Sequence, residues 1–391
     1  MQPVQIKALV NTMYTEVTGQ AAEGILNEDL SNIVSVGETL MSTTWREKYV
    51  NSLLNQIGRM EFVERPYNGI APDVRRESWE WGSILSKSRT KDFEAVENPS
   101  WNLTKGTPVE NFPYEPPEVQ TTLYNELITW EIDCSFVNRQ VKQSFTSVEQ
   151  FDRFFSMIRS HINNNIVQNL DNLTMRTINA FIGRRINTGI GIIDVLAKYN
   201  AAFGTSLTAA QAITNKDFCR YFAYLVLLYR DRMRAKHKVF SENQEGYTTF
   251  TPEDYAHVVI HSDLGKAMDI YLQSETYHDT YTKIGKYDTI PYWQSTGSDF
   301  DFNVTSRIDI TLPGITPAAT VNRNYILGTI FDRDATGVFN QDRRVEVSYN
   351  ARGEYWSNFY KIDTMLFNDP AENGIVFVAG NGAISGNGAI S

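Results

Sequence analysis

Hydrophobic residues keep one helical period over residues 146–183, the longest run of this kind in the chain. They recur every three or four residues, which places them on one face of an α-helix. The run skips only Thr177. The apolar stripe consists of Val148, Phe151, Phe155, Ile158, Ile162, Ile166, Leu170, Leu173 and Phe181. The pattern therefore predicts one long spine helix over residues 146–183.

Both ends of this helix carry terminal signals. Thr146 and Glu149 form a capping-box pattern at the start. Gly183 predicts the end, because Arg184 and Arg185 would place cations at the negative end of the helix dipole. At 1.5 Å per residue the helix would be roughly 55 Å long, against the usual three or four turns. Such a length indicates a scaffold along which other parts of the chain are arranged.

The opposite face of the spine helix is rich in amides and arginines, among them Arg153 and Arg159. A coiled coil would repeat heptads with charged flanks, which this stretch lacks. We therefore expect this face to meet solvent or a neighbouring molecule, and Arg153 and Arg159 are candidate contact residues. The alternative interpretation is a long helix inside a large enzyme domain.

The chain before the spine helix divides into three stretches. Residues 1–31 are polar and show no steady period, which is typical of an arm. Residues 45–57 predict a short amphipathic helix ended by Gly58. Residues 66–127 hold seven of the thirteen prolines, which excludes a helix and most central strands.

Within the proline-rich stretch, residues 74–81 and 121–127 alternate in polarity, which predicts two long antiparallel arms joined near residues 97–107. The stretch has too few aliphatic residues for its own core, so we expect contact with another subunit to order it. Its aromatic and arginine side chains suit protein contacts or, alternatively, stacking on single-stranded nucleic acid. Nearby carboxylates balance the charge and favour protein partners. The candidate anchors are Arg75, Arg76, Trp79, Trp81 and Trp101.

Helices and strands mix in the remaining sequence. Residues 215–235 predict an apolar helix, and residues 257–261 predict a buried strand followed by a helix at 264–271. Further strands are predicted at 308–312, 325–331, 343–349, 356–366 and 375–378. Strands and helices without strict alternation indicate the α+β class.

Composition limits the possible functions. The net charge of −10 and the pI near 5.1 argue against a protein dedicated to binding nucleic acid. Two distant cysteines, Cys134 and Cys219, exclude a disulfide scaffold and fit a reducing compartment. We expect no membrane partner, because no apolar segment is long enough to span a bilayer.

A search for catalytic chemistry yields a single constellation. His257, His261 and Asp263 lie close together in sequence and suggest a metal site or a hydrolytic triad. The apolar residues between the two histidines favour a buried strand instead. Walker, nucleophile-elbow and His-Glu-x-x-His patterns are absent, so we expect no catalytic residues, no cofactor and no metal.

Several segments, in this order, resemble the major capsid proteins of phi29-like podoviruses, short-tailed phages with the Hong-Kong-97 (Johnson) fold. The similar segments are residues 49–58, 151–164, 257–264 and 350–356, the last running into 375–378. The resemblance implies an α+β capsid fold with a spine helix at 146–183 and a projecting β-hairpin, the E-loop, at 63–130. It also implies an N-terminal arm with a short helix at 1–62, a peripheral domain at 131–199 and 344–379, and an axial domain at 200–343. The repeated six-residue segment at 380–391 separately predicts a flexible tail.

The resemblance further implies a virion protein that self-assembles through pentamers and hexamers into an icosahedral shell around phage double-stranded DNA. The implied partners are other copies of the chain, a separate scaffolding protein, a portal and, non-specifically, the packaged DNA. Assembly would take place in the cytoplasm of the host bacterium. Three alternatives stay open: the shell of an encapsulin-like nanocompartment, another virion part such as a portal or tail protein, and a hydrolase using His257, His261 and Asp263.

Overall fold

A computed structural model of the chain describes residues 67–76, 84–110, 114–125, 127–137, 148–243, 245–273, 285–295, 300–312, 319–353 and 355–380, with the single residues Asn11, Thr15, Phe112 and Gly314. The predicted helix at 45–57 and the tail beyond Gly380 lie outside the described residues, as does most of the predicted arm. The chain consists of two compact units. Unit 1 comprises residues 1–67, 134–165 and 347–358, and unit 2 comprises residues 68–133, 166–346 and 359–391.

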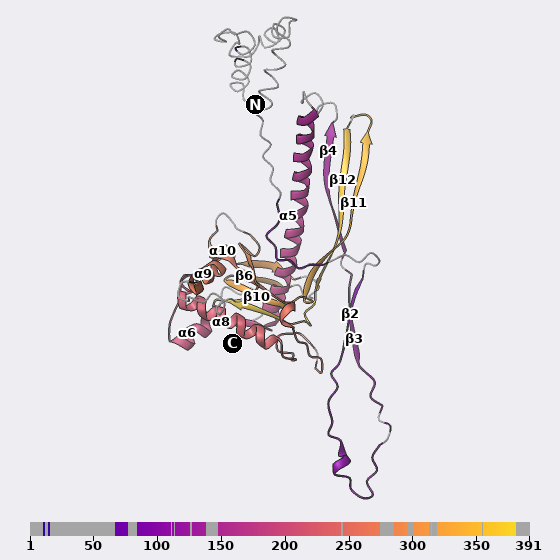
Figure 1. Ribbon diagram of the computed structural model, residues 1–391, viewed down its shortest axis with the longest axis vertical. Coiled ribbons are helices and arrows are strands. Elements are labelled where there is room, and N and C mark those ends of the chain that lie inside the picture. The colour runs from indigo at the N-terminus through magenta and orange to yellow at the C-terminus, as the bar shows by residue number, and fades with distance from the viewer. Residues whose placement is uncertain are drawn as a thin grey trace. The chain divides into compact units, whose positions relative to one another are not determined.

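The predicted spine helix is helix α5, which spans Val148–Thr188 (Figure 1). Its first part, up to Asn165, belongs to unit 1, where the side-chain oxygen of Asn164 accepts a 2.8 Å hydrogen bond from the Tyr67 N–H. From Ile166 on it belongs to unit 2. Ile162, Leu170 and Phe181 of the apolar stripe are buried, as the periodicity predicts.

The prediction that Gly183 ends the helix is wrong. The helix ends at Thr188, and the next residue, Gly189, has φ +74° and donates a 3.0 Å hydrogen bond to the Arg185 carbonyl. A Cβ at Gly183 would lie 3.0 Å from both Ile310 and Leu312. The missing side chain thus allows strand β8 (Ile308–Thr311), which pairs with β9 (Thr320–Arg323), to approach the helix closely.

A five-stranded sheet forms the centre of unit 2, in the order β5-β13-β10-β6-β7. Its strands are β5 (Ile192–Asp194), β13 (Gly374–Val378), β10 (Ile326–Asp332), β6 (Ala256–His261) and β7 (Asp288–Ile290). The β10 and β13 strands pair antiparallel and every residue of both is buried, since each face of the sheet is covered. The sheet contains the strands predicted at 257–261, 325–331 and 375–378.

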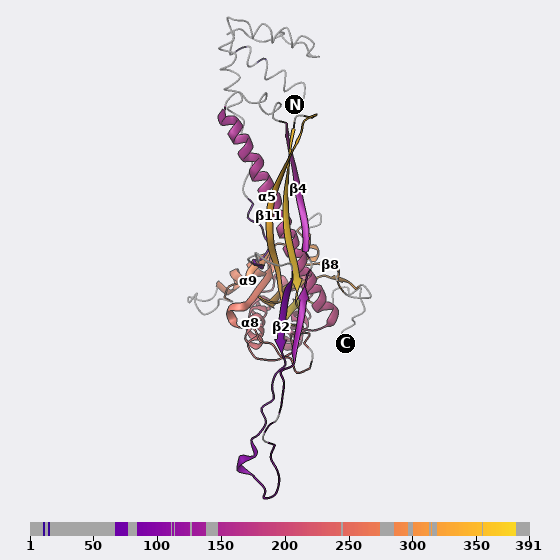
Figure 2. The same cartoon turned by 90° about the vertical axis from the view of Figure 1, so that its right-hand side faces the viewer.

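The two faces of this sheet pack on different helices (Figures 1 and 2). Alternate side chains of β13 take part: Phe377 packs with the helical layer, whereas Val376 packs with α5, β8 and β9. The helical layer consists of α6 (Val195–Phe203), α7 (Ala209–Ile213), α8 (Lys216–Met233) and α9 (Ser262–Gln273). The side chain of Asn215 caps α8 by accepting a hydrogen bond from the Phe218 N–H, which explains why this helix begins where the sequence predicts.

A second sheet has the strand order β1-β11-β12-β4 (Figure 2). It combines the short β1 (Arg75–Arg76) with the three longest of the described strands, β11 (Thr336–Asn350), β12 (Tyr355–Asn368) and β4 (Leu127–Val137). Short helices lie at η1 (Pro99–Trp101), η2 (Glu253–Tyr255) and α10 (Phe302–Thr305). Among the described residues, no helix is both long enough and apolar enough to cross a membrane.

The projecting hairpin differs from its prediction in one arm. Strand β3 (Val119–Tyr124) lies where the second arm was expected, but its partner is β2 (Leu85–Thr90), in the register Leu85–Tyr124 to Thr90–Val119. The first expected arm, 74–81, instead supplies β1, which pairs parallel with β11. Only residues 75–76 of that arm form the strand, and residues 77–81 lie outside the described residues.

Candidate functional site

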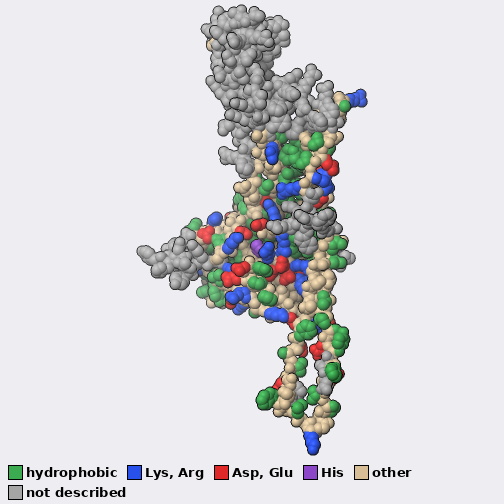
Figure 3. Space-filling model, turned by 45° about the vertical axis from the view of Figure 1, so that its right-hand side comes forward, with side chains coloured by type: hydrophobic (Ala, Val, Ile, Leu, Met, Phe, Trp, Pro, Cys, Tyr) green, Lys and Arg blue, Asp and Glu red, His purple; other side chains and the backbone are tan. Residues whose placement is uncertain are grey.

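The hairpin of β2 and β3 continues into a long loop, residues 91–118, that buries few of its apolar side chains. Trp101 is 93% exposed, and Figure 3 shows hydrophobic side chains along both sides of the loop. The exposed large apolar residues are Phe93, Val96, Trp101, Leu103, Val109, Phe112 and Tyr114. Monomeric proteins rarely expose apolar residues in such density, which indicates a surface that binds another molecule.

The loop is also acidic. Residues 91–118 carry six carboxylates and only two lysines, Lys91 and Lys105. A surface that covers this loop must therefore offer cations together with apolar area.

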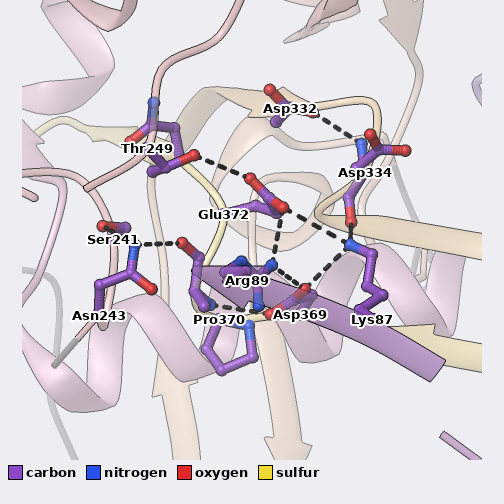
Figure 4. Close-up of polar contacts among 12 residues, drawn as sticks. Lys87, Arg89, Ser241, Asn243, Thr249, Asp332, Asp334, Asp369, Pro370 and Glu372 are labelled. Atoms are coloured by element: carbon purple, nitrogen blue, oxygen red, sulfur yellow. Dashed lines mark hydrogen bonds and ion pairs between the residues drawn. The ribbon is translucent and has the colours of Figure 1, made fainter. Parts of the chain in front are cut away.

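Two cations on β2 fix the base of the loop (Figure 4). Lys87 and Arg89 are two residues apart in a strand, so both side chains lie on one side of the hairpin. The Lys87 Nζ donates to Asp369 Oδ2 at 2.9 Å and to the Asp334 carbonyl at 2.6 Å. Arg89 donates to Asp369 Oδ2 and, at 2.7 Å, to Glu372 Oε1. We call Lys87, Arg89, Asp369 and Glu372 the basal clamp.

In the basal clamp, the opposite charges and hydrogen bonds outweigh the cost of burial. The Asp369 side chain is only 1% exposed. Burial by itself would raise the pKa of this carboxyl, but Lys87 and Arg89 outweigh burial and hold the pKa below its usual range. Burial opposes the charge of Arg89 as well, yet hydrogen bonds and charges from the two carboxylates raise its pKa above the ordinary value. Asp369 and Arg89 are therefore both charged at neutral pH.

A second contact holds the loop just beyond the strands. The Asp92 carboxylate accepts hydrogen bonds from Lys236 and Thr248, and its N–H donates a 2.9 Å hydrogen bond to the Gly246 carbonyl. Gly246 has φ +85°, and a Cβ there would lie 2.6 Å from the Lys91 side chain, so glycine is needed at this position. Beyond Asp92 the loop leaves the rest of unit 2.

The predicted contact residues have different surroundings. Arg75 donates to Asp171 of α5 at 2.9 Å, and Arg76 pairs with Asp334 at 2.8 Å and stacks over Phe367. Both arginines thus make contacts within their own chain. Trp101 and Arg159 are exposed. Trp79, Trp81 and the side chain of Arg153 lie outside what the structure describes.

A groove lies beside the base of the loop. It is bounded by the end of β3, the start of β4, α5 and β12. Leu123, Ile128 and Leu366 supply apolar walls, and Arg176 of α5 adds an exposed cation. The groove thus combines the apolar area and the positive charge that the loop requires of a partner.

The alternative catalytic site, predicted at His257, His261 and Asp263, is not an open site. His261 is buried and its Nδ1 lies 3.9 Å from Asp263 Oδ2, while His257 stacks on Phe331 with ring centroids 5.7 Å apart. Burial lowers the pKa of both histidines, so both are neutral at pH 7. In the part of the chain that the structure describes, His, Cys, Asp and Glu side chains form no group that would hold a metal ion.

Comparisons with known proteins identify the family. The family description of the Phi29-like phage major capsid protein matches residues 10–378. A comparison with curated proteins gave no match.

Solved structures with a similar fold come from phage particles. A chain in the capsid structure of Staphylococcus phage Andhra has 11% identity and a TM-score of 0.56, over 83% of this chain and 87% of that one. A chain in the structure of the head fiber and inner core protein gp22 of native bacteriophage P68 has 10% identity and a TM-score of 0.55, over 82% and 87%. These matches confirm the predicted α+β capsid fold, and the comparisons do not favour a nanocompartment shell or a hydrolase. The chain belongs to the family of Phi29-like phage major capsid proteins, and its function is to form the capsid shell.

Proposed function

We propose that the subunits close the shell through pentamers and hexamers, and that the E-loop of each subunit, residues 63–130, covers a neighbour. The observation that carries this proposal is the density of exposed apolar residues on an acidic loop whose base is fixed. The apolar side chains of such a loop contribute favourable free energy only when another surface buries them.

The groove beside α5 is the surface of a second copy that we propose as the receptor for the loop. Its apolar walls suit side chains such as Phe112 and Tyr114, and Arg176 suits the carboxylates of Glu110 and Glu115. Trp101 remains a proposed anchor. For Arg75 and Arg76 we propose an indirect role in assembly, because they hold the segment before the loop against α5 and β11.

The proposal assigns the remaining segments as follows. Residues 1–62 act as an arm between subunits, residues 131–199 and 344–379 form the peripheral domain, and residues 200–343 form the axial domain. The tail is 380–391. A scaffolding protein and a portal are proposed partners during assembly in the host cytoplasm, and the chain has no enzymatic role. Its net charge of −10 supports weak, non-specific contact with packaged DNA.

The test removes the loop and keeps its base. Residues 94–115 are replaced by a short Asn-Gly turn, which leaves the basal clamp and the Asp92 contact intact. We expect the variant to remain folded and soluble, because the removed side chains contribute little to the core of unit 2, and to form no shells. Electron microscopy of this variant, which keeps the rest of the chain, gives the result when any scaffolding partner is supplied. Closed shells of normal size would refute the proposal.

A further inference from the structure

The helical layer of unit 2 has two different edges. The central sheet below it ends in β5 on one side and in β7 on the other. Helix α6 begins directly after β5, whose last residue, Asp194, caps it. Helix α9 lies close against β7, because a Cβ at Gly265 would lie 2.9 Å from the Thr289 side chain. Helix α8 packs on both α6 and α9 (Figure 1), so these two helices lie at opposite edges of one layer.

The α6 edge exposes an aromatic ring that is already fixed. Phe203, at the end of α6, is 59% exposed. Its ring centroid lies 4.8 Å from that of Tyr199 and 5.7 Å from that of Tyr221 on α8. A ring held by two others loses little rotamer freedom when a second molecule covers it, which suits an anchor of a protein interface. The charged residue of this helix is Lys198, which is also exposed.

The α9 edge exposes an apolar side chain among carboxylates. Ile270 is 63% exposed, whereas Leu264 of the same helix is fully buried. Asp263, Lys266 and Ile270 are exposed and follow the spacing of three and four residues that defines one helix face. With Asp269, helix α9 has two carboxylates and one cation. Its net charge is therefore opposite to that of α6.

The shell function of the chain indicates what covers these two edges. Copies in a ring of five or six meet through a heterologous contact, in which one surface of a subunit packs on a different surface of the next. The two edges meet this requirement, because each exposes an apolar side chain and their net charges are opposite. A two-fold contact would instead place each edge against its own copy and oppose like charges.

We propose that the α6 edge of one subunit packs against the α9 edge of the next subunit in the same ring, with Phe203 beside Ile270. This inference rests on the pentamers and hexamers proposed above, and it involves surfaces other than the E-loop and its groove. Two short helices bury less than the roughly 800 Å² per partner of a standard interface. The contact is thus weak alone and gains strength when the ring closes.

Thiol cross-linking of assembled shells tests how the edges pair. Ala202→Cys and Lys266→Cys are placed in one chain, next to the two apolar side chains, and Cys134→Ser removes the more exposed native thiol; Cys219 is buried and stays. A short bis-maleimide then joins neighbouring thiols. Because each subunit has a different neighbour on each side, we expect covalent ladders that end at five and six subunits. Each single-cysteine variant should give monomers, and a mixture of the two should give dimers only.

A substitution at the anchor distinguishes a specific contact from chance proximity. Phe203→Ser in the two-cysteine chain is expected to reduce the covalent ladders roughly tenfold in the same assembly reaction. Phe250→Ser is the matched control, because Phe250 is 52% exposed and lies on neither helix, and it should leave the yield unchanged. Circular dichroism confirms that both variants are folded. A yield that Phe203→Ser does not change would exclude Phe203 as the anchor.

The outcomes separate this inference from the proposed function. Closed shells without covalent ladders would overturn the contact between the edges and leave the pentamers and hexamers standing. Cross-linking of a single-cysteine variant with itself would also overturn it, because like edges would then meet. Ladders that continue past six subunits would support the contact and contradict closure through pentamers and hexamers.

Discussion

Replacement of Arg89 by Met tests how firmly the basal clamp fixes the loop. Met keeps an apolar stem of similar length and removes the hydrogen bonds to Asp369 and Glu372. Loss of one partner of a buried ion pair costs about 3–5 kcal/mol. Lys87 stays 2.9 Å from Asp369 and neutralises part of its charge. We therefore expect a loss of about 2–3 kcal/mol in the free energy of unfolding.

Urea unfolding of the unassembled subunit, followed by circular dichroism at pH 7, measures this loss. Lys91→Met is the matched control, because Lys91 pairs with Glu118 at 3.1 Å while the two side chains are 40% and 65% exposed. That pair should contribute less than about 1 kcal/mol. In the double variant with Asp369→Asn, the two losses should not add, because both substitutions remove the same contact. If Arg89→Met destabilises the chain no more than Lys91→Met, the basal clamp does not hold the loop.

Two further predictions concern the loop and a buried carboxyl. Trp101→Ala should leave the unfolding free energy within about 0.5 kcal/mol of the parent, because the side chain is exposed. The same substitution should weaken each subunit contact by on the order of 2 kcal/mol, which a raised critical concentration in light-scattering assembly assays would reveal; an unchanged concentration would exclude Trp101 as an anchor. Burial raises the pKa of Asp332 from 3.8 to about 6, so the folded chain binds this proton more tightly than the unfolded chain and loses stability as pH rises from about 4 to 6. Asp332→Asn should reduce the change of melting temperature with pH over that interval. If the melting temperature of the variant changes with pH as steeply as that of the parent, Asp332 does not cause the loss of stability.

The periodic elements were predictable from the sequence because local pattern determines them. The stripe of α5 follows its buried face, and the apolar spacing over residues 215–235 follows the buried face of α8. The strands of the central sheet are recognisable as short apolar runs, since both faces of that sheet are covered. Gly183 misled the prediction because a glycine in a helix serves either as a stop or as a site of close approach, and only the position of β8 decides between them.

The basal clamp was not predictable in the same way. Lys87 and Arg89 show by their spacing that they share one side of a strand, but their partners, Asp369 and Glu372, lie about 280 residues later in a turn. No local pattern connects the two segments. The exposed apolar residues of the loop were visible in the sequence, whereas the exposure of Phe203 and Ile270 required the packing of α6 and α9 to be known.

The base of the loop is fixed within the chain, whereas its apolar side chains beyond Asp92 are exposed and available for binding. The basal clamp and the Asp92 contact fix the hairpin before a second subunit arrives, so association need not bear the full entropy of ordering those strands. The apolar side chains beyond Asp92 are uncovered in the single chain, and the proposed contact with a neighbour would bury them. A shell is built from many such contacts, each of which must be weak enough for misplaced subunits to leave, while their sum closes the particle. Exposed aromatic side chains on a fixed base meet both requirements, because the tip determines the strength of each contact and the base determines its direction.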